Sequence, residues 1–595
     1  MNVKNNATRT CALLAMVSLL SVSCKKGTTS EKDNGPEKLK LQTLQITPIQ
    51  DLNQGTAVIN SHAASTARSS LKMNYRSYVS LGQSSLGVTA PNYPRVKKLA
   101  NGSYIMFYHN NQVSASVRYA TSPDLTTWTP QGDIYQNYNI IDQDGQANQR
   151  RFANGDALVL ANGDILVVAS FRANSGYRQK PLDAGIALRR STDNGVTWSA
   201  PIEIYQGVNW EPYLLQLPSG EIHCYFTDAA RTGVVGTDTG TAMVESGDNG
   251  NTWSPAFGSA PYYVLRTQYT HNGVTFFNNQ MPAVIKLNNR NELAAAMEAN
   301  TGNGYYISLA YSGTDGTWTH LNVNQEGPAD RNDMAFQGAA PYIRQFPSGE
   351  TVLSYNRSSA FQMRMGDTSA RNFGAEYAPL TGGYWGSLEL ENSHQIIGAF
   401  PNPSSGVIKV AKFILNHRIQ AASQTIQVDG NSSEWANTGE ALFVGDRSQA
   451  QATLRVAQNS DSVYFLLEVL DEKIAAEDFA TLLTMQPTSN DMLTNGARRF
   501  IVSHDGLRST NGYNGGWVAG NPQANIRATY QGTISQHSDT DEGYVVEMAI
   551  PRSRLTIVSG KLLVNFSITD SESGEDAIFN TTSASTAKWI EVSGL

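Results

Sequence analysis

Two octapeptides, STDNGVTW at 191–198 and SGDNGNTW at 246–253, decide how this chain folds. Both match the pattern Ser-x-Asp-x-Gly-x-Thr-Trp, and shorter relatives occur as SPDLTTW at 122–128 and SGTDGTW at 312–318. In such a motif the Asp caps a tight turn, the Gly supplies unusual backbone angles and the Trp packs beneath them. We therefore expect these aspartates to shape turns between strands and to have no catalytic role.

A second repeat surrounds these turns, in which an apolar strand, a tight turn and another apolar strand recur six times. The hairpins occupy residues 96–109, 157–172, 213–228, 283–298, 342–357 and 387–400. Most of their intervals are close to the length of a four-stranded blade with its connections. The sequence therefore predicts an all-β chain with a six-bladed β-propeller at 76–412, and its turn motif resembles the Asp box of sialidase-like propellers.

The composition favours this fold and excludes one class of function. The chain has 595 residues with 50 Gly, 26 Tyr and 9 Trp, which suits short strands, tight turns and aromatic contacts to carbohydrate. Its net charge of −7 lacks the basic surplus that a nucleic-acid surface needs. We expect a monomer with a polysaccharide or oligosaccharide substrate and no nucleic-acid partner.

The N-terminus has the pattern of an export signal. Residues 1–24 contain basic residues, an apolar segment too short to span a bilayer, and small residues before Cys24. This arrangement resembles a bacterial lipobox, which implies a lipid on Cys24 that anchors the protein to the outer membrane of the cell envelope, facing the periplasm or the exterior. A flexible tether is expected at 25–75. An ordinary cleaved signal peptide is the alternative.

Cysteine and histidine usage predicts neither a disulfide framework nor a metal site. Of the three cysteines, Cys11 would be removed with the signal and Cys24 lipidated, so Cys224 is left as the one ordinary thiol. The sequence has no Cys/His cluster that suggests zinc. We expect no metal and no organic cofactor to be required, although propellers and sandwiches can hold a structural calcium.

Antiparallel geometry places polar residues from several blades on one rim. The first strand of a blade starts on the face where the second strand ends, so residues at these two positions share that face. The side chains there that suit sugar binding are Arg95, Arg172, Asn174, Asp228, Gln280, Arg357 and Trp385. We expect them to bind substrate, while a rim that is polar because it is wet is the alternative.

Two acids lie at the same rim on neighbouring blades. Glu211 opens the first strand of blade three, and Glu298 closes the second strand of blade four. Glycoside hydrolysis uses two carboxyl groups, one that protonates the leaving oxygen and one that attacks or stabilises the anomeric carbon. Proximity would drive their pKa values apart. For each residue the alternative is a strand-end acid without a catalytic role.

The segments around these acids resemble glycoside hydrolase family 93, the exo-acting arabinanases built on six-bladed propellers. The likeness covers roughly residues 85–410. Its most specific segments are the two that contain the acids, WEPYLLQLPSGEIHCYF (210–226) and QMPAVIKLNNRNELAAAMEAN (280–300). The segment GGYWGSLELENSHQIIGAF (382–400) is similar to a late blade of that family. The resemblance implies that Glu211 is the nucleophile, Glu298 the general acid/base and Tyr384 a further active-site residue. It implies exo-hydrolysis of an α-linked arabinan-type polysaccharide with retention.

Two other functions stay open at this point. A sialidase would bind a carboxylated sugar with three arginines, and Arg95, Arg172 and Arg357 all fall on the rim. The first of them, however, occurs in NYPRVKK, whereas that family has a Phe/Tyr-Arg-Ile-Pro context, and no Asp acid or Tyr–Glu pair follows in the family's order. The other alternative is a surface lipoprotein that binds glycan without cleaving it.

Residues 413–595 have a different pattern, with alternating strands that indicate a β-sandwich. The stretch VDGNSSEW (428–435) and the strands near 463–471 and 547–551 resemble carbohydrate-binding module family 9. Such a module implies sugar held between aromatic faces. A module that serves only as a spacer is the alternative.

The aromatic residues of this C-terminal region have different expected roles. Trp517, in the Gly-rich stretch NGYNGGWVAGN, is the first candidate for sugar binding, and Tyr513 is the second. Trp435 is expected in the core. The sequence leaves the role of Trp589 undecided.

Overall fold

The computed structural model describes residues 68–110, 116–229, 239–319, 326–520 and 523–595. The described chain is built from strands, so the expected all-β class is confirmed. Its helices are α3 (Gln83–Leu86), η1 (Tyr177–Gln179), η2 (Pro181–Asp183), η3 (Ser432–Asn437) and η4 (Arg552–Arg554). Among these residues, no helix combines the length and the apolar character needed to cross a membrane.

Six antiparallel sheets follow one another up to Asn416. Sheet 1 contains β2 (Asn92–Lys98), β3 (Tyr104–His109), β4 (Val117–Ser122) and β5 (Thr129–Tyr135). Sheet 2 contains β6 (Tyr138–Ile141), β7 (Ala147–Val159), β8 (Ile165–Ala173), β9 (Gly185–Ser191) and β10 (Ile202–Gln206). Sheet 3 contains β11 (Asn209–Gln216), β12 (Ile222–Asp228), β13 (Gly240–Ser246) and β14 (Tyr262–Leu265).

The remaining three sheets repeat this order. Sheet 4 contains β17 (Gln280–Lys286), β18 (Leu293–Asn300), β19 (Tyr305–Tyr311) and β20 (Arg331–Gln337), and it is preceded by the hairpin of β15 (Gln268–His271) and β16 (Val274–Phe277). Sheet 5 contains β21 (Ala339–Gln345), β22 (Thr351–Arg357) and β23 (Ala360–Gly366). Sheet 6 contains β24 (Ser387–Leu390), β25 (Gln395–Asn402), β26 (Val407–Asn416) and β1 (Ser70–Leu81).

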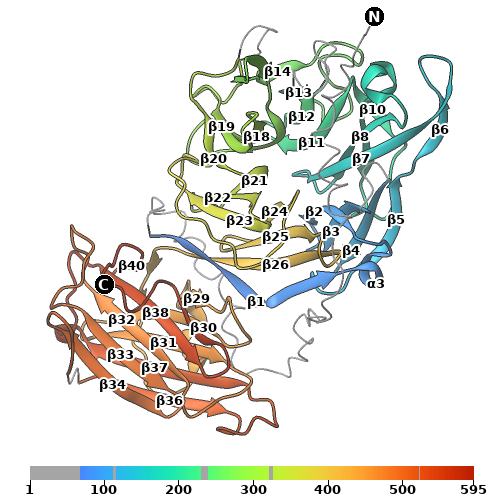
Figure 1. Ribbon diagram of the computed structural model, residues 1–595. Coiled ribbons are helices and arrows are strands. Elements are labelled where there is room, and N and C mark those ends of the chain that lie inside the picture. Colours follow the sequence, from blue (N-terminus) through green and yellow to red (C-terminus); the bar gives the residue numbers. More distant parts are fainter. Residues whose placement is uncertain (1–67, 111–115, 230–238, 320–325, 521–522) are drawn as a thin grey trace, which may run out of the picture. The chain divides into compact units, whose positions relative to one another are not determined.

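Six strands, the first of each sheet except that sheet 2 contributes β7 and not β6, form a closed ring of contacts. Going round the ring, β2 contacts β7, β7 contacts β11, β11 contacts β17, β17 contacts β21, β21 contacts β24, and β24 contacts β2. Figure 1 labels all of these strands except β17. Each sheet therefore presents one strand to the centre. This propeller-like arrangement brings residues from distant parts of the sequence to one place.

Strand β1 comes from the other end of this part of the chain and completes sheet 6. It pairs antiparallel with β26, from Ser70 opposite Asn416 to Leu81 opposite Ile408. The predicted tether of 25–75 therefore ends too late, because strand β1 begins at Ser70. The physical reason is burial, since Leu71 and Met73 alternate with polar residues and pack into the hydrophobic core.

The Asp turns have the structural function that their sequence predicts. The Asp193 carboxylate accepts hydrogen bonds from the Ser191 hydroxyl at 2.8 Å and from the Thr197 backbone N–H at 2.9 Å. Gly195 has a φ of +86° in this turn. The second complete motif repeats these contacts at Asp248, with distances of 2.8 Å and 2.8 Å. Both carboxylate oxygens of each aspartate accept hydrogen bonds within the motif, which is the structural role that the sequence predicts.

Two further sheets follow in the C-terminal part of the chain. The first contains β27 (Ile419–Gln420), β32 (Phe479–Met485), β33 (Arg498–Ser503), β34 (Gly506–Tyr513), β35 (Trp517–Ala519), β38 (Leu562–Asp570), β39 (Gly574–Ala577) and β40 (Ile590–Ser593). The second contains β28 (Ala422–Ser423), β29 (Leu442–Val444), β30 (Gln451–Gln458), β31 (Ser462–Leu470), β36 (Asn525–Gln531) and β37 (Gly543–Pro551). Buried residues of both sheets, such as Phe465 and Phe566, belong to one core.

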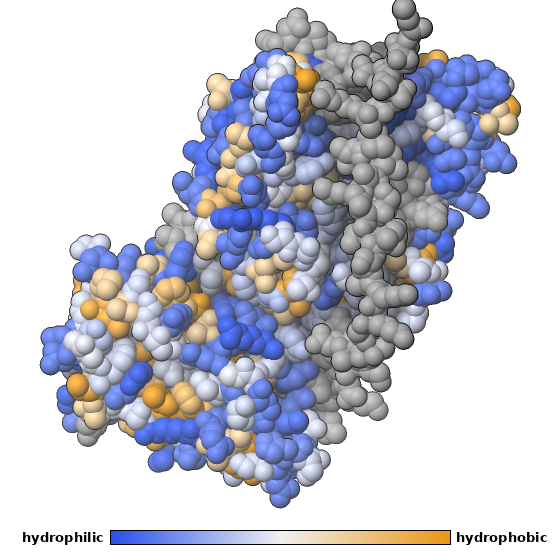
Figure 2. Space-filling view, in the orientation of Figure 1, coloured by the Kyte–Doolittle hydropathy of each residue, from blue (hydrophilic) through white to orange (hydrophobic). Residues whose placement is uncertain are grey.

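Trp435 lies in the interior, as its sequence context predicts. Its indole N–H donates to Oε1 of Glu547 at 2.7 Å, and Oε2 of the same carboxylate accepts from the backbone N–H groups of Asp429 and Gly430. Trp589 is also buried. Neither indole can therefore offer its face to a sugar. The face of the molecule seen in Figure 2 is mostly polar, with apolar residues in small scattered patches.

Candidate active site

Each strand of the ring has, within it or just before it, one non-glycine residue in the left-handed backbone region. These residues have φ between +53° and +58°, and a Pro or Gly follows each of them: Tyr93, Asn154, Glu211, Met281, Ala340 and Trp385. Strand pairing shifts in register at this point in sheets 1 to 5. Residues with side chains enter this region only at a cost in free energy, and such strain concentrates at functional sites.

Four of these six residues meet one another. Tyr93, Met281 and Ala340 form a buried cluster, and Trp385 packs against it. They come from sheets 1, 4, 5 and 6, so this contact lies at the centre of the ring of strands. Glu211 occupies the equivalent position in sheet 3 and is the one acid among the six. The repeat therefore places a carboxyl group at the centre.

A second set of polar residues lies opposite these positions on the neighbouring strands. In sheets 1 to 5, each of them pairs in the strand register with the residue just before the left-handed residue. They are His109, Ser170, Thr227, Glu298 and Asn356. Two of them bind the left-handed residue of the next sheet. Thr227 Oγ1 accepts the backbone N–H of Met281 at 2.9 Å, and Glu298 Oε2 accepts that of Ala340 at 2.8 Å. Glu298 thus occupies in sheet 4 the position that a threonine occupies in sheet 3.

Glu211 is a half-buried acid whose surroundings act on its charge in both directions. Burial raises the pKa of its carboxyl group, and the charge of Glu298 raises it further. The hydrogen bond that Thr227 Oγ1 donates at 3.2 Å favours the ionised form, as do the nearby charges of Arg95 and Arg172. The net result is a pKa above the ordinary range of a glutamate.

Glu298 is more deeply buried, with 6% of its surface exposed. Burial raises its pKa as well, and the hydrogen bond from the Ala340 N–H opposes the shift in part. Because the two carboxyl groups influence each other, they titrate as a pair, and one proton is shared between them over a range of pH. Two interacting carboxyl groups with raised pKa values can supply one carboxylic acid and one carboxylate, which acid–base or nucleophilic chemistry requires.

The raised pKa of Glu211 makes a testable contribution to stability. Its folded-state pKa lies above its ordinary value of 4.5, so the stabilising protonated form is fully present below about pH 4.5 and is lost as the pH rises through the folded-state value. Glu211→Gln has no carboxyl group to ionise, so the variant does not lose this stability as the pH rises. We expect the melting temperature of the variant to exceed that of the wild type by several degrees at pH 8 and to match it near pH 4.5. A difference that does not change with pH would contradict the raised pKa.

Aromatic side chains border the pair. Tyr384 is half-buried and meets Trp385 edge to face, with ring centroids 4.7 Å apart. Burial raises the pKa of Tyr384, and the charges of Glu298, Tyr305 and Glu211 add to the shift. Burial and the charges of Glu298 and Glu211 raise the pKa of Tyr305 to about 12. Tyr305 was not among the residues predicted from the sequence, although it follows Glu298 closely, across the turn between β18 and β19.

The two arginines near Glu211 are held in different ways. Arg95 is buried, and its Nη1 donates to the carbonyl oxygens of Pro94 and Trp385, both at 2.9 Å. Its guanidinium also stacks 3.9 Å from the centre of the Tyr93 ring. Arg95 therefore joins sheet 1 to sheet 6, and its expected role in binding sugar hydroxyls stays a prediction. Arg172 is half-buried, and its guanidinium lies 4.7 Å from the centre of the Tyr177 ring.

The other expected substrate-binding residues are dispersed. Gln280 is buried beside Glu298 in the strand register and donates to Asn278 Oδ1 at 2.7 Å. Asp228 is buried and accepts a hydrogen bond from the Tyr205 hydroxyl at 3.5 Å. Arg357 pairs with Glu376 at 2.7 Å. Asn174 is exposed. Of these residues, Gln280 is the one that the register places directly opposite a member of the pair.

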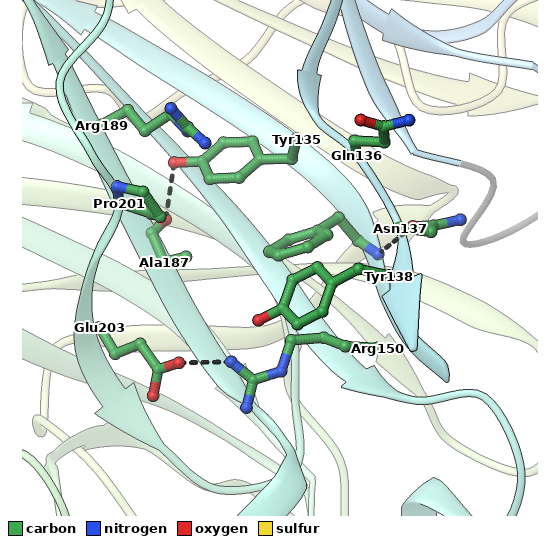
Figure 3. A pocket seen from close by; sticks show the side chains of 10 residues that line it. Tyr135, Gln136, Asn137, Tyr138, Arg150, Ala187, Arg189, Pro201 and Glu203 are labelled. Carbon is green, nitrogen blue, oxygen red and sulfur yellow. Dashed lines mark hydrogen bonds and ion pairs between the residues drawn. The ribbon is translucent and has the colours of Figure 1, made fainter. Parts of the chain in front are cut away.

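The pockets described for this structure lie elsewhere, on sheet 2. One is lined by Tyr135, Tyr138, Arg150, Arg189 and Glu203 among others (Figure 3). Its charged groups are used within the protein, since Arg150 forms an ion pair with Glu203. A second, more open hollow is lined by polar residues that include Asn174. Neither contains a titratable pair of the kind formed by the two glutamates, which remain the stronger candidate.

In the C-terminal sheets, the expected sugar-binding aromatics lie together. Trp517 and Tyr513 are half-buried, with ring centroids 5.4 Å apart and an interplanar angle of 73°. The Arg499 guanidinium lies 4.9 Å from the centre of the Trp517 ring. Both rings pack on one side against a buried cluster that contains Trp589. The predicted lipidation site, Cys24, lies outside the described residues.

Comparisons with known proteins do not assign the chain to a family. No protein-family model matches it, and no curated protein matches it. Among solved structures, a protein of unknown function from Dyadobacter fermentans is 17% identical, over 58% of this chain and 99% of that chain, with a TM-score of 0.43. An endo-arabinase from Bacteroides thetaiotaomicron is 17% identical, over 46% of this chain and 93% of that chain, with a TM-score of 0.33. A sialidase from Trypanosoma rangeli is 12% identical, over 82% of this chain and 97% of that chain, with a TM-score of 0.37. Likeness at this level assigns no activity to the chain.

Proposed function

We propose that the six sheets are the blades of one six-bladed propeller and that Glu211 and Glu298 hydrolyse glycosidic bonds at its centre. The observation that carries this proposal is the carboxyl pair. Two glutamates from neighbouring sheets interact electrostatically, and both have a raised pKa. A carboxylic acid can then protonate the departing oxygen while a carboxylate attacks the anomeric carbon.

The two carboxyl groups of the pair have different surroundings. Thr227, Arg95 and Arg172 favour the charged form of Glu211, but burial and the charge of Glu298 outweigh them, and the net pKa of Glu211 is raised further than that of Glu298. The order of roles therefore rests on the family 93 resemblance. Glu298 is the more buried acid, and the N–H of Ala340 binds its Oε2, so Oε1 is left for proton transfer. We assign Glu211 as nucleophile and Glu298 as general acid/base. Hydrolysis would then proceed through a glycosyl-enzyme with retention of configuration.

For the substrate, we propose the end of an α-linked arabinan-type polysaccharide. The support is the family 93 resemblance of the segments that contain both acids, together with the aromatic border of Tyr384, Trp385 and Tyr305. The sialidase alternative is less well supported. Arg95 donates to two backbone carbonyls and Arg357 pairs with Glu376, so neither is arranged to hold a carboxylated sugar. Arabino-oligosaccharides and sialyllactose are the substrates that separate the two activities.

We further propose that the two C-terminal sheets form a β-sandwich that binds carbohydrate through Trp517 and Tyr513. Trp517→Ala removes one aromatic face, and we expect about tenfold weaker binding to insoluble or long-chain arabinan, since such a contact is worth roughly 1.4 kcal/mol. The rate on a short soluble oligosaccharide should not change. Trp517→Phe, which keeps a ring, should lose less affinity. Equal binding by Trp517→Ala and wild type, measured by affinity electrophoresis, would refute the role.

The attachment to the cell envelope stays a proposal that rests on the N-terminal sequence. If Cys24 is the lipidation site, expression in a bacterium that processes lipoproteins should incorporate labelled palmitate into the wild type and none into Cys24→Ser. The variant should then leave the membrane fraction. Equal labelling of both proteins would exclude Cys24 as the site.

A further inference from the structure

Four buried polar side chains lie close together at a site that includes neither Glu211 nor Glu298. His394 lies in the turn between β24 and β25, His417 follows β26, Glu440 precedes β29 and Glu350 precedes β22. Each is at most 3% exposed. One ligand atom from each of His394, His417 and Glu440 lies within 4.8 Å of the others. Two imidazoles and a carboxylate form a donor set that suits a zinc ion.

The spacing within this histidine–glutamate cluster (His394, His417 and Glu440) fits one small cation. His394 Nε2 lies 3.7 Å from Glu440 Oε1, and His417 Nε2 lies 3.5 Å from Glu440 Oε2. Zinc bonds of about 2.0–2.2 Å at tetrahedral angles separate neighbouring ligand atoms by roughly 3.3–3.6 Å. The observed distances are too long for good hydrogen bonds and close to those of atoms that share an ion.

Some of the ligand atoms of this cluster have no hydrogen-bond partner in the part of the chain that the structure describes. His394 Nε2 and both carboxylate oxygens of Glu440 are buried and have no hydrogen-bond partner among the described residues. A buried carboxylate without hydrogen bonds is costly unless a cation neutralises it. The arrangement therefore requires a positive charge at this place.

The opposite nitrogens of the two rings have polar neighbours, as those of metal-binding histidines usually do. Glu350 Oε1 lies 3.6 Å from His417 Nδ1, and it accepts a hydrogen bond from the Ser69 hydroxyl at 3.0 Å. The Ser393 hydroxyl lies 3.0 Å from His394 Nδ1. The serine contact orients the His394 ring, and the Glu350 carboxylate lies on the Nδ1 side of His417 as an acidic neighbour beyond hydrogen-bond distance.

Two other groups of acids and histidines lack these features. In the group of Glu221, His223 and Glu245, both ring nitrogens of His223 already have partners, Tyr225 and Glu221. In the group of Asp471, Asp478 and Asp570, backbone N–H groups already bind the carboxylates, for example those of Lys473 at Asp471 and Ala475 at Asp478. In neither group do buried ligand atoms without a hydrogen-bond partner lie close to one another.

We propose that His394, His417 and Glu440 bind one Zn²⁺ ion in the folded protein, through the two Nε2 atoms and the Glu440 carboxylate. The ion holds the β24–β25 turn, the end of β26 and the segment before β29 together. It is a structural site, because its ligands are buried and no substrate can reach it. Binding requires both imidazoles to be neutral, so it releases any proton that His417 holds. The site is independent of the proposed hydrolysis, and the sequence does not predict it.

Metal analysis of the purified full chain, prepared without a histidine tag, tests this proposal. After incubation with ZnCl₂ and dialysis, we expect one zinc per chain by mass spectrometry. Treatment with a strong chelator should lower the melting temperature by several degrees, and zinc should restore it, because a ligand of the folded state stabilises it. Cobalt substitution should give the intense visible absorption of a tetrahedral site. No retained zinc in the wild type would overturn the proposal and leave a protonated His417 as the neutralising charge.

Matched variants locate the ion. His394→Gln and Glu440→Gln should retain less than about a tenth of an equivalent, and Glu350→Gln should bind zinc about 10–100-fold more weakly, as expected for loss of an outer partner. His504→Gln, which replaces a buried histidine outside the cluster, should keep one equivalent. Zinc bound with unchanged affinity by His394→Gln would mean an adventitious ion and would refute the site. If a variant fails to fold, the reversible chelator effect on the wild type decides the question by itself.

Discussion

Replacing Glu298 by Gln should lower kcat on an arabino-oligosaccharide by about 10²–10⁴-fold, the usual contribution of a general acid/base. The substitution removes the transferable proton and keeps the shape of the side chain. A Gln side-chain oxygen can still accept the N–H of Ala340, which Glu298 Oε2 accepts at 2.8 Å. The folded state and substrate binding should therefore be retained. The measurement is steady-state hydrolysis, with the melting temperature determined in parallel.

Two companion variants separate chemistry from folding. Glu211→Gln should be at least as inactive as Glu298→Gln, because it removes the nucleophile. Glu298→Ala should in addition destabilise the protein by about 1–3 kcal/mol, since it leaves the buried N–H of Ala340 without an acceptor. If Glu298→Gln keeps more than a tenth of the wild-type kcat, Glu298 is a structural acid that links sheet 4 to sheet 5 and has no part in catalysis.

A chain that begins after Leu81, and so lacks strand β1, should fail to form the folded ring of sheets. The deletion removes Leu71, Met73, Tyr78 and Leu81 from the core, at about 1.5–3 kcal/mol each, or roughly 6–12 kcal/mol together. That loss is comparable to the whole stability of a typical domain. It also leaves β26 as an open edge, which favours aggregation. Circular dichroism and size-exclusion chromatography report the outcome.

The matched control is a chain that begins at Arg68 and keeps every residue the structure describes. It should have the melting temperature of the full-length protein. A point variant, Met73→Asp, places a charge in the same core and should destabilise strongly while leaving the chain length unchanged. A folded, monomeric protein without β1 would show that the ring does not depend on this strand for its closure.

The class of fold was predictable because its signals are local. Each Asp turn is a short motif whose hydrogen bonds form within the motif, and turn glycines such as Gly102, Gly163 and Gly220 have the positive φ that their hairpins require. The role of β1 was not predictable in this way. Its partner is β26, at the other end of the six sheets, and no local pattern in residues 70–75 distinguishes a closing strand from a tether.

The two glutamates were predictable as strand-end acids, and their electrostatic interaction came from the fold. The ring brings Glu211 to the centre because the same left-handed position recurs in or just before every strand of the ring. A sequence signal for this exists, since a Pro or Gly follows each of these residues, as at Pro94, Pro212 and Pro282. That signal also shows that Trp385, and not Tyr384, is the equivalent of Glu211 in sheet 6.

The rest of the site depends on contacts between distant segments. Sequence alone does not show whether a rim arginine faces solvent or donates to a carbonyl 290 residues away, as Arg95 does at Trp385. The histidine–glutamate cluster is similar, because its ligands are separated along the chain and have none of the spacing of a zinc motif. Both features follow from the closure of the sheets.

Product analysis after incubation with linear α-linked arabinan is the most direct test of the proposed catalytic pair. The wild-type protein should release one short sugar product from the first minutes while the polymer shortens slowly, as an exo-acting enzyme does, and Glu211→Gln should release none. Identical release by the wild type and Glu211→Gln would contradict a catalytic role for the pair. Absence of any product from arabinan bound by the folded wild-type protein would contradict the proposed reaction.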